Sequence, residues 1–125
     1  MNLLLDTNIL IWLYEESPVL KAETRAIVTS RANQVTVSIA SIWEMSIKQA
    51  SGKLKIPDNL LALLELNNMQ LLPIDVEHAF AVGSLPPLHG DPFDRMLVAQ
   101  AMLEDLTIMT HDKKITAYSV SCLLV

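Results

Sequence analysis

A chain of 125 residues, 51% of them hydrophobic, fits one compact domain (1–125) with its own core, and its single cysteine excludes a disulfide-stapled fold. Nine basic against fourteen acidic residues leave a net charge of −5, which excludes a module that grips nucleic acid by positive charge alone. An enzyme whose bound cations bridge carboxylates to phosphate is not excluded. The apolar N-terminus lacks the basic start of a secretory signal, and no apolar run reaches the ~20 residues of a membrane span. We therefore expect a soluble cytoplasmic protein.

The first half of the chain alternates short strands with helices. Residues 1–5 form an apolar run, which is typical of a strand buried on both faces. A short helix is predicted over 9–14, and Pro18 begins a longer helix to residue 30, since proline is tolerated in a first turn. Alternating valines predict a strand over 34–37, and apolar residues at helical spacing predict a helix over 38–50.

The second half continues this alternation around one long loop. Pro57 begins a predicted helix to residue 66, and Asp75 caps another that reaches residue 82. Prolines and a glycine mark a loop over 86–92, which precedes an amphipathic helix over 93–104. The remaining predicted elements are strands over 70–73, 107–109 and 120–124 and a short helix over 112–117. This order predicts an α/β fold with a mostly parallel sheet covered by helices on both faces.

Four acidic residues fall where such a fold brings side chains together. Asp6 directly follows the first predicted strand, and Asp112 follows the strand after the long amphipathic helix. Because the carboxyl ends of parallel strands open onto the functional crevice, both carboxylates are expected at one edge of the sheet. Asp94 lies in the first turn of the helix after the proline-rich loop, and Glu44 lies on the polar side of the helix after the second strand.

The predicted acid cluster would hold several like charges within a few ångströms, which are stable only when protons or cations neutralise them. All-oxygen ligands suit Mg²⁺ or Mn²⁺ rather than zinc, and the three histidines do not form a zinc-ligand spacing. A cluster that holds one or two such ions is suited to phosphodiester hydrolysis. Each acid alone has an ordinary explanation as a helix cap or a solvated charge. Composition and spacing by themselves therefore indicate a metal site and no more.

Four segments stand out in order along the chain: Leu-Leu-Leu-Asp-Thr-Asn at 3–8, Ser-Ile-Ala-Ser-Ile-Trp-Glu at 38–44, His-Gly-Asp-Pro-Phe-Asp-Arg at 89–95 and Thr-His-Asp at 110–112. They resemble, in the same order, the motifs of the PIN-domain family and of its VapC-like toxins. Any one of these motifs is weak, but four in the family's order make the resemblance specific, and it runs over the whole chain. It implies a three-layer sandwich with a five-stranded parallel sheet of order 3-2-1-4-5.

The resemblance also implies Mg²⁺- or Mn²⁺-dependent cleavage of RNA, with one or two ions. Matched motif by motif, it gives the metal-binding and catalytic roles to four acids: Asp6, Glu44, Asp94 and Asp112. It gives a supporting role to Thr110 and has Asn8 orient the first of these acids. Asp91 is either a further metal ligand or a loop cap, and we favour the cap.

Other side chains near the acids have more ordinary interpretations. Arg95 either holds a phosphate or pairs with a neighbouring carboxylate, and the sequence does not decide between them. Trp43 is expected to pack in the core. The scattered lysines are expected to be solvated, with a positive rim for RNA as the alternative: Lys48, Lys53, Lys55, Lys113 and Lys114.

Proteins of this kind act as homodimeric toxins of type II toxin–antitoxin pairs, so the resemblance implies a cognate antitoxin and an RNA substrate. The helices within 9–32 and 60–66 carry enough apolar residues for a partner surface, although an ordinary core would use them equally. Two alternatives remain. One is a PIN fold that binds RNA or protein without cutting, which the presence of all four acids disfavours. The other is a nuclease for structured DNA, which the lack of an arch-like insertion disfavours.

Overall fold

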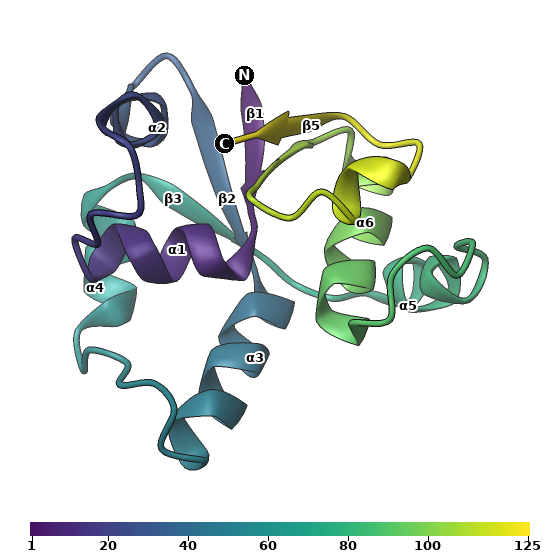
Figure 1. Ribbon diagram of the computed structural model, residues 1–125, viewed down its shortest axis with the longest axis horizontal. Coiled ribbons are helices and arrows are strands. Elements are labelled where there is room, and N and C mark those ends of the chain that lie inside the picture. The colour runs from purple at the N-terminus through teal and green to yellow at the C-terminus, as the bar shows by residue number, and fades with distance from the viewer.

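A five-stranded parallel sheet forms the middle layer of the computed structural model, which describes residues 1–125. Its order is β3-β2-β1-β4-β5, with every neighbouring pair parallel. The strands are β1 (Asn2–Leu5), β2 (Gln34–Ser38), β3 (Met69–Leu72), β4 (Thr107–Thr110) and β5 (Cys122–Leu124). The predicted α/β class and the strand order 3-2-1-4-5 are thus confirmed (Figure 1).

Helices form the two outer layers. They are α1 (Thr7–Tyr14), α2 (Ala22–Thr29), α3 (Ile39–Ala50), α4 (Leu60–Leu66), α5 (Val76–Gly83), α6 (Pro92–Glu104) and the 3₁₀ turn η1 (Ile115–Ala117). None of them has the length and hydrophobicity that a membrane span requires.

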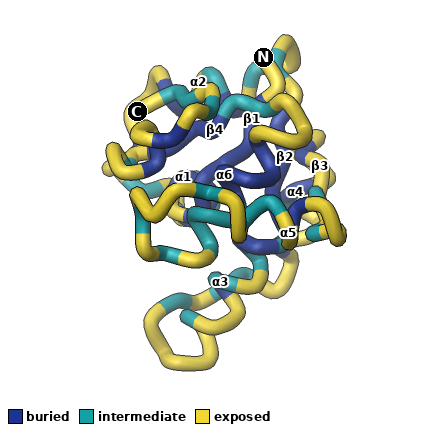
Figure 2. Tube along the Cα trace, turned by 90° about the vertical axis from the view of Figure 1, so that its right-hand side faces the viewer, coloured by how far each residue is buried: buried dark blue, intermediate teal, exposed yellow.

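The central strand β1 divides the core because its side chains alternate between the two faces of the sheet. Leu3 and Leu5 pack into a cluster that α1, α2 and α4 cover. Leu4 packs into a second cluster, which α6 covers. All three leucines are fully buried, and Figure 2 shows the strands as the buried centre of the molecule. This alternation explains why an apolar run without polar interruption was needed at the N-terminus.

Helix α3 has a special place because it begins directly where β2 ends, at the carboxyl edge of the sheet. The Ser38 hydroxyl accepts a hydrogen bond from the Ala40 amide and caps the helix. α3 contacts both α1 and α6, and its far end extends away from the sheet (Figure 1). Side chains from α1, α3 and α6 can therefore meet beside the ends of β1 and β4.

Helix α2 is shorter than the predicted helix over 18–30. It begins only at Ala22. Before it, the Ser17 hydroxyl accepts a hydrogen bond from the Val19 amide, and the Ser17 carbonyl accepts one from the Leu20 amide. These local bonds form a turn that competes with helix at this point. The predicted helix over 112–117 is likewise reduced to η1.

Candidate functional site

Asp6 lies at the carboxyl end of the central strand, where its carboxylate is buried and held from two sides. The Asn8 amide donates to its Oδ1 at 3.3 Å, which caps α1, and the Thr110 hydroxyl donates to its Oδ2 at 2.6 Å. Burial raises the pKa of Asp6, the two hydrogen bonds lower it, and the charges of Glu44 and Asp112 raise it further. Asn8 orients Asp6 through its backbone amide, since its side chain is exposed.

Thr110 connects two of the acids because its buried hydroxyl also accepts a bond from the Asp112 amide at 3.0 Å. Asp112 lies two residues after the end of β4, and its Oδ1 accepts a hydrogen bond from the Lys114 amide at 2.9 Å. The end of β4 therefore orients one carboxylate directly and aims a second toward the same space.

Asp94 lies in the first turn of α6, and its pKa departs strongly from the ordinary value of an aspartate. Burial, followed by the charges of Asp6 and Asp91, raises the pKa of Asp94 to about 7, although His89 opposes the shift. Asp91 is the N-cap of α6, and its Oδ1 accepts the Phe93 and Asp94 amides at 2.8 and 3.0 Å. Of its two predicted roles, the structure shows the cap.

His89 is a site residue that the sequence did not indicate. Its Nε2 lies 2.9 Å from Asp94 Oδ2 and 3.0 Å from Asp112 Oδ2, so the imidazole bridges two carboxylates. Its amide donates to the Tyr118 hydroxyl at 3.0 Å, which fixes the loop that carries it. The carboxyl oxygens and this ring nitrogen lie close enough to share one ion.

Arg95 forms no ion pair with a carboxylate, which was one of its two predicted roles. Its guanidinium donates to the backbone carbonyls of Val82, Leu85 and Pro86 and to the Tyr118 hydroxyl. These four bonds use the donors that a phosphate or a carboxylate would need. Arg95 therefore holds the loop between α5 and α6 in place, and with it the loop that carries His89.

Glu44 supplies the fourth carboxylate from α3. Its Oε2 pairs with Lys48 at 3.0 Å, whereas its Oε1 is buried and has no hydrogen-bond partner. A buried carboxylate oxygen without a donor is costly unless a cation or a water molecule satisfies it. Together with the raised pKa values of Asp6 and Asp94, this oxygen shows that the residues present fit a divalent cation with oxygen ligands.

Trp43, expected in the core, is instead 57% exposed. α3 buries Ala40, Ser41 and Met45, and the indole lies on the other side of the helix and faces outward. Its ring meets Phe93 of α6 edge to face, with centroids 4.9 Å apart. The expectation failed because the face of α3 that packs into the core carries Ala40, Ser41 and Met45, and Trp43 lies off that face.

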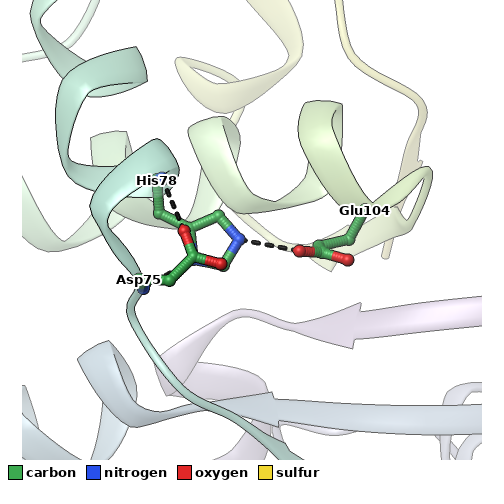
Figure 3. Close-up of side chains that lie close together, drawn as sticks. All are labelled: Asp75, His78 and Glu104. Atoms are coloured by element: carbon green, nitrogen blue, oxygen red, sulfur yellow. Dashed lines mark hydrogen bonds and ion pairs between the residues drawn. The ribbon is translucent and has the colours of Figure 1, made fainter.

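A second cluster of histidine and acids lies away from the sheet edge, between α5 and α6 (Figure 3). The fully buried His78 accepts the Asp75 amide on Nδ1 at 3.0 Å, and its Nε2 contacts Glu104 at 2.9 Å. The Asp75 carboxylate in turn accepts the His78 amide, which completes a capping box. Both ring nitrogens are thus occupied by the protein, and the cluster joins two helices.

Replacement of His78 by Ala is expected to lower the free energy of unfolding by about 3 kcal/mol, because it leaves a cavity and an unpaired Asp75 amide. Urea denaturation measures this loss. Val76→Ala, at an exposed position of the same helix, is the control and should change stability by less than about 0.5 kcal/mol. An equal, small effect of both variants would show that the cluster does not stabilise the fold.

The comparisons with known proteins agree with this architecture. The family model for the PIN domain matches residues 3–120. None of the curated proteins matches the sequence. Among solved structures, VapBC2 from Rickettsia felis, bound to a DNA fragment from its promoter, is similar with a TM-score of 0.73 and 17% identity, covering 99% of this chain and 98% of that chain.

Two further solved structures show the same fold. VapBC-1 from nontypeable Haemophilus influenzae is similar with a TM-score of 0.64 and 20% identity, covering 99% of this chain and 98% of that chain. A toxin–antitoxin complex from Klebsiella pneumoniae is similar with a TM-score of 0.66 and 20% identity, covering 96% of this chain and 94% of that chain.

Proposed function

Because this chain belongs to the PIN-domain family, a family of nucleases, we propose that it is a metal-dependent endoribonuclease and the toxin of a type II toxin–antitoxin pair. The observation that carries the proposal is the meeting of four carboxylates from separate elements at one sheet edge, with one buried oxygen of Glu44 left without a partner. In this proposal, residues 1–125 form a single nuclease domain that acts in the cytoplasm.

The residues proposed to hold one or two Mg²⁺ or Mn²⁺ ions are Asp6, Glu44, Asp94 and Asp112. Bound there, the cation would lower the pKa of the attacking water and stabilise the leaving oxygen. Thr110 keeps Asp6 in place through its short hydrogen bond, and Asp91 contributes as the cap of α6.

The proposed reaction is in-line attack of water on an RNA phosphodiester. The water oxygen forms a bond to phosphorus while the bond to the 3′ oxygen breaks, and that oxygen takes a proton from solvent. The proton lost by the water passes to bulk solvent. The products therefore carry 5′-phosphate and 3′-hydroxyl ends.

Substitution of Thr110 by Val is expected to weaken Mn²⁺ binding by about 10- to 100-fold, since it removes the hydroxyl that orients Asp6 and keeps the side-chain shape. Isothermal titration calorimetry with Mn²⁺ measures the effect. Thr110→Ser retains the hydroxyl and should bind like the unaltered protein. Wild-type affinity in the valine variant would remove Thr110 from the site.

Two observations support an antitoxin partner in this proposal. The surface has an apolar groove, and one of the solved structures similar to this chain is a toxin–antitoxin complex. The groove lies between α1, α2 and α4, the helices whose apolar residues the sequence analysis considered for a partner surface. Its apolar lining consists of Leu10, Leu13, Tyr14, Leu60, Leu63, Leu64 and Met69. The Tyr14 hydroxyl beside this groove has no hydrogen-bond partner. A homodimer remains part of the proposal.

The test is cleavage of total and synthetic RNA by the purified, antitoxin-free protein with Mg²⁺ or Mn²⁺ and with EDTA. We expect cutting only with the metal, and products whose 5′ phosphate is a substrate for a 5′-phosphate-dependent exonuclease. Cleavage that persists in EDTA would contradict the metal-dependent reaction. Cleavage of structured DNA but not of RNA would favour the DNA nuclease, and binding without any cleavage would favour the silent module.

A further inference from the structure

Two aromatic side chains form a rigid surface at the carboxyl edge of the sheet. Trp43 of α3 is 57% exposed and Phe93 of α6 is half-buried. Their rings meet edge to face, with centroids 4.9 Å apart and an interplanar angle of 79°. This geometry is the favourable one for an aromatic pair, and it fixes the orientation of the indole although more than half of that side chain lies in solvent.

The pair lies beside the acid cluster, since it joins α3 and α6, the two helices that carry Glu44 and Asp94, and the charges of these two acids act on each other. Exposed aromatic rings bind unpaired bases by stacking, whatever the base, because every base has a π-face. We propose that the Trp43–Phe93 pair stacks an unpaired nucleobase of single-stranded RNA beside the phosphodiester at the acids. The proposal rests on the proposed ribonuclease function and names the strand that the site accepts.

The segment that follows Trp43 is basic in an otherwise acidic protein. Lys48, Lys53 and Lys55 lie in α3 and in the loop after it, and residues 45–57 contain no aspartate or glutamate. This part of the chain projects from the body of the molecule, as both views show (Figure 1, Figure 2). Lys48 pairs with Glu44, so the exposed Lys53 and Lys55 are the lysines that offer positive charge to the phosphates of a strand whose base stacks on the indole.

A second copy of the chain is a poorer occupant of the same surface. In a two-fold dimer the same patch faces itself, so the lysines of two α3 segments would be brought together. Two aromatic side chains also bury at most about 500 Å² between them. A stable interface needs about 800 Å² from each partner. Charge and area both favour an anionic strand.

The experiment measures binding of a short single-stranded oligoadenylate in the Asp94→Asn background, which is expected not to cut. Trp12→Phe leaves Trp43 as the only tryptophan, and its fluorescence should be quenched as the oligoadenylate binds. Trp43→Ala should weaken binding by roughly 5- to 150-fold, which corresponds to about 1–3 kcal/mol per stacked base.

Three variants separate stacking from other effects. Trp43→Phe should retain most of the affinity, whereas Trp43→Leu, which keeps apolar bulk without a π-face, should lose as much as the alanine variant. Phe80→Ala is the matched control, because Phe80 is 79% exposed on α5, which packs against α6 rather than α3. Unchanged oligoadenylate binding by both the alanine and the leucine variants of Trp43 would overturn the proposal.

Two further outcomes are informative. If Trp43→Ala instead turns a dimer into a monomer in sedimentation and leaves RNA binding unchanged, the surface belongs to a second copy and the proposal is wrong. Equally tight binding of an RNA duplex, which offers no unpaired base, would also contradict it. Failure of the ribonuclease function is distinguishable, since it is the loss of metal-dependent cleavage by the unaltered protein.

Discussion

Asp94→Asn is expected to lose RNA cleavage by at least about 10³-fold, because removal of one carboxylate costs several kcal/mol of transition-state stabilisation in a metal site. The same change should raise the free energy of unfolding in EDTA. The carboxyl of Asp94 is buried beside other acids, with a pKa raised to about 7, so its ionised form destabilises the metal-free protein near neutral pH. An amide of the same shape carries no charge to desolvate.

Activity and stability should thus change in opposite directions, which distinguishes loss of a ligand from loss of the fold. Cleavage of RNA with Mn²⁺ and thermal unfolding in EDTA measure the two. Asp105→Asn is the matched control, since Asp105 is an exposed aspartate at the other end of α6 and has a positive φ of 54° that asparagine tolerates. Substantial residual cleavage, or an unfolded Asp94→Asn variant, would contradict the assignment.

The fold could be predicted from the sequence because its elements have strong local patterns. The apolar strand β1 ends at Leu5, directly before Asp6, in both the prediction and the structure, since a strand buried on both faces leaves little freedom in its boundaries. The start of α2 was wrong because the Ser17 hydroxyl forms a local turn, and no periodic pattern reveals such a bond.

The positions of Asp6, Asp94 and Asp112 were predictable for the same reason, since each follows a strand or lies in the first turn of a helix. Glu44 lies in the middle of α3, and only the resemblance to the PIN-domain motifs gave it a role. The place of His89 was not predictable, because it depends on the path of a proline-rich loop that Arg95 and Tyr118 fix through hydrogen bonds. Trp43 was placed in the core by its hydrophobicity. In the structure the buried face of α3 instead carries Ala40, Ser41 and Met45.

Stability of the metal-free protein should fall as the pH rises from about 4 to about 7, on the order of 2–4 kcal/mol through Asp94 alone. An aspartate side chain ordinarily has a pKa of 3.8, whereas the pKa of Asp94 in the folded protein is about 7. Between these values the folded protein holds a proton that the unfolded chain has released. Stability therefore decreases with pH across this window, and the full penalty is present above it.

Chemical denaturation in EDTA at several pH values measures this slope, and the difference between the unaltered protein and Asp94→Asn isolates the one carboxyl. The variant should show a much flatter profile, because it lacks the Asp94 carboxyl. Some slope of the same sign should remain, because the pKa of Asp6 is also raised. Added Mn²⁺ should restore the lost stability above about pH 7, since a cation binds the ionised carboxylates of the folded protein. Equal pH profiles of the unaltered protein and of Asp94→Asn in EDTA would show that Asp94 is not buried among like charges.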